Sequence, residues 1–191
     1  MHGTLSGVSY IHEKGIIHMD IKPENILIGK AHEPKVGDFG IAIHFMDVSS
    51  RVGCGTSGYW APEQMGTAGD QRLNHKIDIW PCGVVAFMVC TLSFPWTDGE
   101  TPSRQRDVDV DLKHGFASPL WEHRRPLDDV VRLACRVDVD ERANADDCRR
   151  LLDDLVSAKA ASGAPRSSSG KAADRLLHKM NKRGEAHNVG P

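Results

Sequence analysis

The sequence predicts a mainly α-helical domain with a small β-hairpin, followed by a basic C-terminal tail. Two patterns and the composition support this fold class. Apolar residues recur with helical spacing in several segments, and two short apolar runs flank a turn, as the strands of a hairpin do. Of the 191 residues, 40% are hydrophobic and 26% are charged, which is typical of a globular domain.

The first elements in the chain are a helix and a hairpin, separated by a polar loop. Apolar residues at helical spacing, followed by a glycine stop, predict a helix over residues 3–14. Residues 15–25 contain a proline and read as an irregular loop, and short apolar runs predict strands at 26–28 and 35–36. Residues 40–59 show no sustained period and are expected to form a long loop, a feature that is usually functional in a compact domain.

Three further helices are expected in the second half of the domain. Residues 78–91 are apolar on all sides, which is typical of a buried helix. Pro81 falls in the first turn of this helix, where its missing N–H costs no hydrogen bond. Amphipathic patterns predict helices at 126–135 and 143–158, whereas residues 92–117 contain two prolines and many charges and read as irregular.

The C-terminal tail differs from the body in charge. Residues 157–191 hold seven Lys/Arg against two Asp/Glu and therefore carry a charge of +5. The formal net charge of the whole chain is −2, so the residues before this tail carry −7. We therefore divide the chain into a domain at 1–157 and a basic tail at 158–191. Residues 162–170 have the composition of a disordered linker, and apolar residues at helical spacing predict a short basic helix at 172–183. The tail is either a solvated end or a site for an acidic partner, a membrane surface, a calmodulin-like protein or a nuclear import receptor.

Cysteine usage and hydropathy bear on the compartment. The five cysteines form no CxxC pair and no secretory signal opens the chain, which favours free thiols and an intracellular location, cytoplasmic or nuclear. Residues 79–96 lack charges over 18 positions, near the lower limit for a membrane span. Prolines interrupt this stretch, so no membrane span is expected. The small net charge gives no bias toward nucleic acid.

Polar residues crowd the loop before the predicted hairpin, and two distinctive triplets follow it. They are His18, Asp20, Lys22 and Asn25 in the loop, then Asp38-Phe39-Gly40, and then Ala61-Pro62-Glu63. In this order and approximate spacing they resemble the catalytic loop, the metal-binding turn and the end of the activation segment of the protein kinase family. The resemblance covers about residues 1–157 and implies the mainly α-helical C-terminal lobe of a protein kinase-like fold.

The resemblance implies a set of roles in phosphoryl transfer from ATP. Asp20 would accept the proton of the substrate hydroxyl, and Lys22 would offset charge on the transferred phosphate. Asn25 and Asp38 would bind Mg²⁺, which prefers oxygen ligands. Leu27 matches the residue beneath the adenine ring.

Two features favour a Ser/Thr hydroxyl of a protein substrate as the acceptor. Lys22 stands where Ser/Thr kinases place lysine, and residues 55–63 resemble the substrate-docking loop of those kinases. By this resemblance Thr56 would hydrogen-bond toward Asp20 and Lys22 and complete the catalytic group.

Other matches imply structural support for the site. His18 and Phe39 would stack between the catalytic loop and the turn that Gly40 closes. Asp78 would cap the helix that follows and hold the backbone of the catalytic loop. The carboxylate of Glu63 would pair with the guanidinium of Arg142 as a latch.

The sequence also departs from the family. No Gly-x-Gly-x-x-Gly phosphate loop precedes the catalytic loop, so the β-rich N-terminal lobe is expected to be absent and the kinase domain partial. The first hypothesis is a Ser/Thr protein kinase. The alternative is a catalytically inactive, kinase-like binding module, and a membrane-anchored or purely structural helical protein is a third.

Overall fold

Five α-helices and two small antiparallel strand pairs build the part of the chain that the structure describes. The computed structural model describes residues 1–50, 53–65, 73–96, 101–116 and 126–162. Its helices are α1 (His2–Glu13), α2 (Ile79–Thr91), α3 (Gln105–Phe116), α4 (Pro126–Ala134) and α5 (Ala145–Ser162), and its strands are β1 (Ile16–Ile17), β2 (Ile26–Ile28), β3 (Pro34–Val36) and β4 (Ile43–His44). Short 3₁₀ turns at Pro23–Asn25, Phe45–Ser50, Ser57–Tyr59, Pro62–Met65 and His75–Asp78 connect them.

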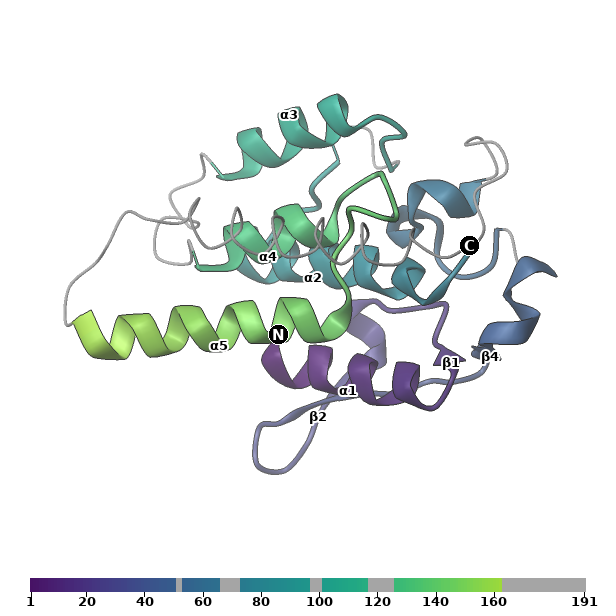
Figure 1. Cartoon of the computed structure of the whole chain (residues 1–191), viewed down its shortest axis with the longest axis horizontal. Helices are drawn as coiled ribbons and strands as arrows, with labels where there is room; N and C mark the ends of the chain where they lie inside the picture. The colour runs from purple at the N-terminus through teal and green to yellow at the C-terminus, as the bar shows by residue number, and fades with distance from the viewer. Residues whose placement is uncertain (51–52, 66–72, 97–100, 117–125, 163–191) are drawn as a thin grey trace, which may run out of the picture.

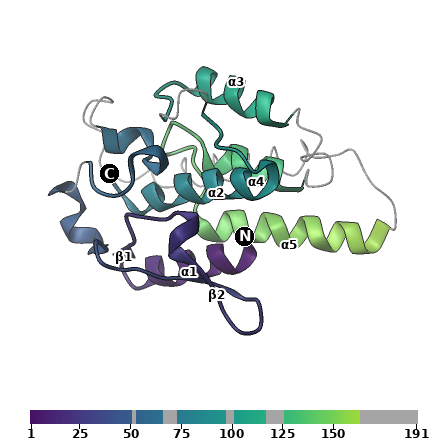
Figure 2. The same cartoon turned by 180° about the vertical axis from the view of Figure 1, so that it is seen from behind.

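Helix α2 lies at the centre, between two layers of helices. Figures 1 and 2 show α3 on one side of the α2–α4 pair and the α1–α5 pair on the other side. All residues of α2 except Met88 and Val89 are buried. This explains why its sequence is apolar on every face, as predicted for a buried helix. Pro81 lies in the first turn, where the fold accommodates it.

Gly83 allows α2 and α4 to pack closely. A Cβ atom at this position would lie 2.6 Å from Sγ of Cys135 and 2.8 Å from Cβ of Ala134, at the end of α4. Cys135 is fully buried there, and burial raises the pKa of its thiol. Cys54 is partly buried and the other four cysteines are buried, and none of the five is part of a disulfide, as the sequence predicts.

The two strand pairs frame the polar loop. In the first, Ile26 pairs with Val36 and Ile28 with Pro34, which confirms the predicted hairpin with β3 one residue longer at its start. The second pair joins Ile17 to Ile43, across the loop and the hairpin. This β1–β4 pair was not predicted, because two residues are too few to show a strand period.

The expectation of irregular structure at 92–117 was wrong in part, because α3 occupies Gln105–Phe116. Val108 and Leu112 lie four residues apart and are buried, which is enough to anchor one face of a helix. The predicted helix at 143–158 begins two residues later and continues to Ser162, with the side chain of Asn144 accepting a hydrogen bond from N–H of Asp147 at 2.8 Å. The predicted linker at 162–170 was wrong at Ser162, which ends α5, and its other residues lie outside the described ones, as does the predicted helix at 172–183.

Among the helices of the described ranges, none has the length and apolar character needed to cross a bilayer.

Candidate active site

The polar loop between β1 and β2 is fixed by one buried carboxylate. Asp78, 1% exposed, accepts hydrogen bonds from N–H of His18 at 2.8 Å and from N–H of Met19 at 2.9 Å. Nε2 of His12 lies 2.9 Å from the same carboxylate. The predicted capping of α2 by this side chain was wrong, because both oxygens face the loop and no cap bond forms. The predicted hold on the loop backbone is present.

His18 links this loop to the turn at Asp38-Phe39-Gly40. Its buried ring donates from Nε2 to the carbonyl of Gly37 at 2.8 Å, and Nδ1 accepts from N–H of Asp20 at 3.3 Å. Its ring meets the ring of Phe39 at 5.0 Å between centroids, edge to face. The predicted contact between these two rings is therefore present, in edge-to-face rather than parallel geometry.

Four polar side chains from two distant segments meet at Asp20. Oδ2 of Asp20 lies 2.8 Å from Nζ of Lys22 and accepts from Nδ2 of Asn25 at 3.1 Å. Oδ1 accepts from both N–H and Oγ1 of Thr56, at 3.0 and 2.7 Å. Nζ of Lys22 also donates to Oγ1 of Thr56 at 2.8 Å. The structure thus brings together the four residues that the sequence placed in the catalytic group.

These contacts keep both charges in place. Partial burial pushes the pKa of Asp20 upward, but hydrogen bonds from Lys22 and Thr56 outweigh burial and leave this pKa below its ordinary value. The hydrogen bond to Asp20 raises the pKa of Lys22. At neutral pH the site therefore holds a carboxylate next to an ammonium group.

Asn25 and Asp38 offer oxygen ligands beside this cluster. Nδ2 of Asn25 donates to the backbone and side chain of Asp20, which leaves its amide oxygen for a ligand. Asp38 is exposed with φ of +59°, and one of its oxygens accepts from N–H of Gly40 at 3.2 Å. The hydrogen bond from N–H of Gly37 to the carbonyl of Asn25, 2.9 Å long, holds the two segments together. One amide and one carboxylate oxygen fit Mg²⁺, which typically takes few protein ligands and completes its shell with phosphates and water.

A metal centre built by the protein alone is not present in the described ranges, where no group of three or more His, Cys, Asp or Glu could hold an ion. Leu27, on β2, has 58% of its surface exposed, so its side chain is accessible to a ligand such as the adenine ring that the resemblance implies.

Comparison with known proteins agrees with this geometry. The family model for the protein kinase domain matches residues 1–159. The chain belongs to the protein kinase family. The described residues correspond to the mainly helical lobe of the kinase fold, with its small hairpin beside the catalytic loop.

Known kinases from animals and plants share about a third of the aligned residues. The chain is 32% identical over 151 residues to the bovine phosphorylase b kinase gamma catalytic chain, liver/testis isoform, covering 76% of this chain and 37% of that protein. It is 35% identical over 144 residues to CBL-interacting protein kinase 29 of Oryza sativa subsp. japonica, covering 72% and 31%. It is 34% identical over 151 residues to the ovarian-specific serine/threonine-protein kinase Lok of Drosophila melanogaster, covering 73% and 30%. The aligned part of the chain spans just over a third of the first of these relatives.

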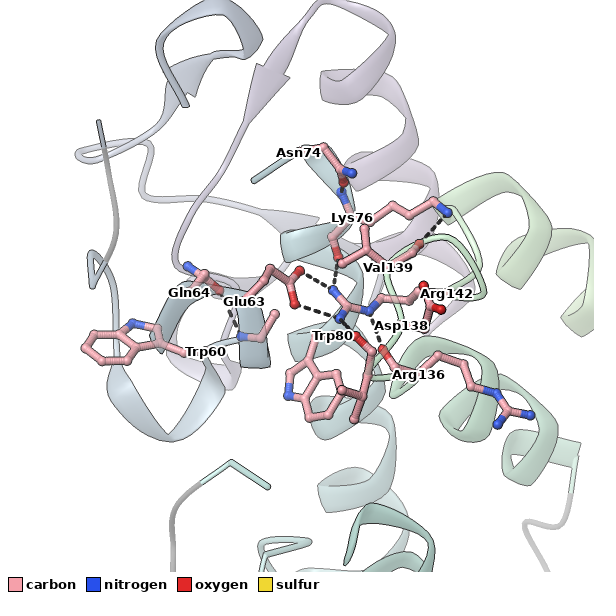
Figure 3. A network of polar contacts seen from close by, with 12 residues as sticks. Trp60, Glu63, Gln64, Asn74, Lys76, Trp80, Arg136, Asp138, Val139 and Arg142 are labelled. Carbon is pink, nitrogen blue, oxygen red and sulfur yellow. Dashed lines mark hydrogen bonds and ion pairs between the residues drawn. The ribbon is translucent and has the colours of Figure 1, made fainter. Parts of the chain in front are cut away.

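The kinase lobe contains the predicted ion pair between Glu63 and Arg142. Nη1 and Nη2 of Arg142 bind the two carboxylate oxygens of Glu63 at 2.6 and 2.8 Å, and both side chains are fully buried (Figure 3). Nε of Arg142 also donates to the carbonyl of Arg136 at 2.8 Å, and Nη1 donates to that of Lys76 at 3.1 Å. The guanidinium lies 5.2 Å from the centroid of the Trp80 ring. The pair joins the end of the activation segment to the loop before α5.

Sequence reasoning missed several polar contacts around the candidate site. His12 reaches Asp78 from the last turn of α1, and Gln64 accepts a hydrogen bond from N–H of Ala61 through Oε1 at 2.9 Å. Lys76 donates to the carbonyl of Val139 at 2.7 Å (Figure 3). Each contact depends on a partner's position in space, so the identity of one polar residue gave no signal for it.

His75 gives the kinase lobe a pH-dependent stability. Its ring stacks on Phe45 at 5.3 Å, and burial lowers its pKa to about 4, with the charges of His12 and Lys76 adding to the effect. The unfolded chain, with an ordinary His pKa of about 6.5, then binds more protons between pH 6.5 and 4. The contribution of His75 to the free energy of unfolding is fully present above pH 6.5 and is lost as the pH drops toward 4. This loss amounts to about 2 kcal/mol once partial solvent exposure is allowed for.

Urea unfolding of wild type and His75→Phe, at pH 7.5 and 4.5, measures this contribution. Phenylalanine keeps a ring for the stack on Phe45 but cannot take up a proton. The variant should lose about 2 kcal/mol less than wild type between the two pH values. An identical loss in both proteins would show that His75 is not the titrating group.

Proposed function

We propose that this chain is part of a serine/threonine protein kinase that transfers the γ-phosphoryl group of ATP to Ser/Thr hydroxyls of protein substrates. The observation that supports this most is the convergence of Asp20, Lys22, Asn25 and Thr56 within hydrogen-bond distance of one another. Phosphoryl transfer depends mainly on positioning and charge stabilisation, and this cluster supplies both. The names of the aligned relatives, including a serine/threonine-protein kinase, agree with the proposal.

Each side chain has a distinct task in the proposed reaction. The carboxylate of Asp20 orients the acceptor hydroxyl and takes its proton, since its lowered pKa keeps it ionised. The ammonium of Lys22 offsets negative charge on the phosphoryl group during its transfer. Thr56 holds Asp20 and Lys22 together through its hydroxyl. Asn25 and Asp38 would hold Mg²⁺, which supplies charge neutralisation on the ATP phosphates.

Support for the remaining parts of the proposal comes from sequence. We assign residues 1–157 to the kinase domain and 158–191 to the basic tail, which carries the opposite charge to the body. A role of the tail with an acidic partner, and a cytoplasmic or nuclear location, stay predictions. Leu27 is proposed to contact the adenine ring from its exposed position on β2.

Nucleotide binding with and without Mg²⁺ tests the proposal on the chain itself. ATP should raise the unfolding temperature of the purified chain more in Mg²⁺ than in EDTA, and a serine peptide should be phosphorylated in preference to its tyrosine analogue. Binding of MgATP without transfer to either peptide would favour the inactive, kinase-like module. No effect of ATP under either condition would contradict ATP-dependent transfer by this chain.

Asp38→Asn is expected to weaken Mg²⁺-dependent ATP binding by at least about tenfold. Even groups that only orient metal ligands are worth 10- to 100-fold in metal affinity, so loss of a ligand charge should cost no less. Titration of ATP at fixed Mg²⁺ measures the change, and Asp154→Asn, at an exposed position on α5, is the matched control. Equal affinities in the two variants would remove Asp38 from the proposed metal site.

A further inference from the structure

Gly55 lies where no other residue fits. A Cβ atom at this position would come closer than 3.0 Å to the carbonyl oxygen of Met19, and it would lie 3.4 Å from Nε1 of Trp60. The φ angle of Gly55 is +96°, a conformation that side chains disfavour. Its Cα therefore rests directly against the backbone of the catalytic loop.

The carbonyl that faces Gly55 cannot easily move away. Met19 itself has φ of +72° and is 5% exposed, and its N–H donates to the buried carboxylate of Asp78. The peptide group that contains this carbonyl also contains N–H of Asp20, which donates to Nδ1 of His18. The N–H groups before and after this carbonyl are thus both hydrogen-bonded. A clash at residue 55 is therefore relieved by movement of the activation segment.

The contact lies one residue before each partner of the central hydrogen bonds. Met19 precedes Asp20, and Gly55 precedes Thr56, whose N–H and Oγ1 donate to Oδ1 of Asp20 at 3.0 and 2.7 Å. A displacement of residue 55 by several tenths of an ångström would therefore lengthen both bonds directly. The spacing between the two backbones and the orientation of Asp20 are set at the same place.

We propose that Gly55 is a positioning residue for phosphoryl transfer: its bare Cα against the Met19 carbonyl places Thr56 on Asp20. The inference rests on the proposed function for its effect on catalysis, but the geometric part stands on the contacts alone. Glycine is needed at this position for the geometry of the site and not only for the positive φ angle. The Cβ atom of any other residue would point at the backbone of the catalytic loop.

Gly53 provides a matched control within the same segment. It also has a positive φ, +72°, but a Cβ there would meet only Cη2 of Trp60, at 3.9 Å. Gly53→Ala and Gly55→Ala therefore both place alanine at a positive φ, and only the second also creates the clash with Met19. Differences between the two variants report on the contact and not on loss of a glycine.

Amide hydrogen exchange of Thr56 and steady-state kinetics are measured for the wild-type chain and both variants. Gly55→Ala should speed exchange of the Thr56 amide at least about tenfold, the effect of losing a hydrogen bond to a charged group. It should lower kcat about 100-fold while KM for ATP stays within about twofold. Gly53→Ala should match wild type in both.

The two readings separate the inference from the proposed function. If wild type transfers no phosphate, the proposed function fails, yet the amide exchange still decides whether Gly55 positions Thr56. Equal Thr56 exchange in both alanine variants overturns the inference. So does an unprotected Thr56 amide in the wild-type chain, a measurement that requires no variant to fold.

Discussion

Asp20→Asn should lower phosphoryl transfer by at least about 10³-fold while leaving the affinity for MgATP within about twofold. Asparagine keeps the size of the side chain but cannot take the proton of the acceptor hydroxyl, and a positioned base contributes roughly 10²–10⁴-fold. It also deprives Lys22 of its charged partner at 2.8 Å. The loss of the base and the loss of orientation act together, which places the expected effect in the upper part of this range.

Initial rates with a serine peptide and thermal shift with MgATP measure the two quantities separately. Asp154→Asn, on the exposed face of α5, makes the same chemical change far along the chain from the catalytic loop and should retain the wild-type rate. Equal rates in Asp20→Asn and wild type would remove Asp20 from the reaction. A parallel loss of nucleotide affinity would instead assign Asp20 a role in binding.

Much of the site could be predicted because its chemistry is local in sequence. Asp20, Lys22 and Asn25 lie within six residues, and their types and spacing are informative without any knowledge of the fold. Helices α1 and α4 were also predictable, since their apolar residues recur at helical spacing, and α2 was predictable because its sequence is apolar on every face. The helical class of the fold follows from these elements.

The parts that could not be predicted depend on distant partners. Helix α3 has a strongly charged sequence, and only its packing shows that Val108 and Leu112 anchor it. Asp78 has the position of a helix cap in sequence, yet its oxygens are taken by N–H groups about 60 residues away. Gly55 likewise reads as an ordinary loop glycine until the Met19 carbonyl is placed against it.

Arg142→Met should lower the free energy of unfolding by about 3–5 kcal/mol. The substitution leaves the carboxylate of Glu63 buried without its cation, and an uncompensated buried charge is among the most costly changes in a protein. The carbonyls of Arg136 and Lys76 also lose their donor. Urea unfolding followed by circular dichroism measures the loss, and Arg150→Met, on the exposed side of α5, should change stability by less than about 0.5 kcal/mol.

A second substitution distinguishes the buried charge from the lost packing. Glu63→Leu combined with Arg142→Met removes both charges, so much of the stability should return, since a buried ion pair gains little over well-packed apolar residues. Recovery should stay incomplete by about 1–3 kcal/mol, because the two backbone carbonyls remain without the donors that Arg142 supplied. A double variant no more stable than Arg142→Met would show that the guanidinium acts through those carbonyls and the Trp80 ring. In that case the loop before α5, and not the Glu63 carboxylate, would be what Arg142 stabilises.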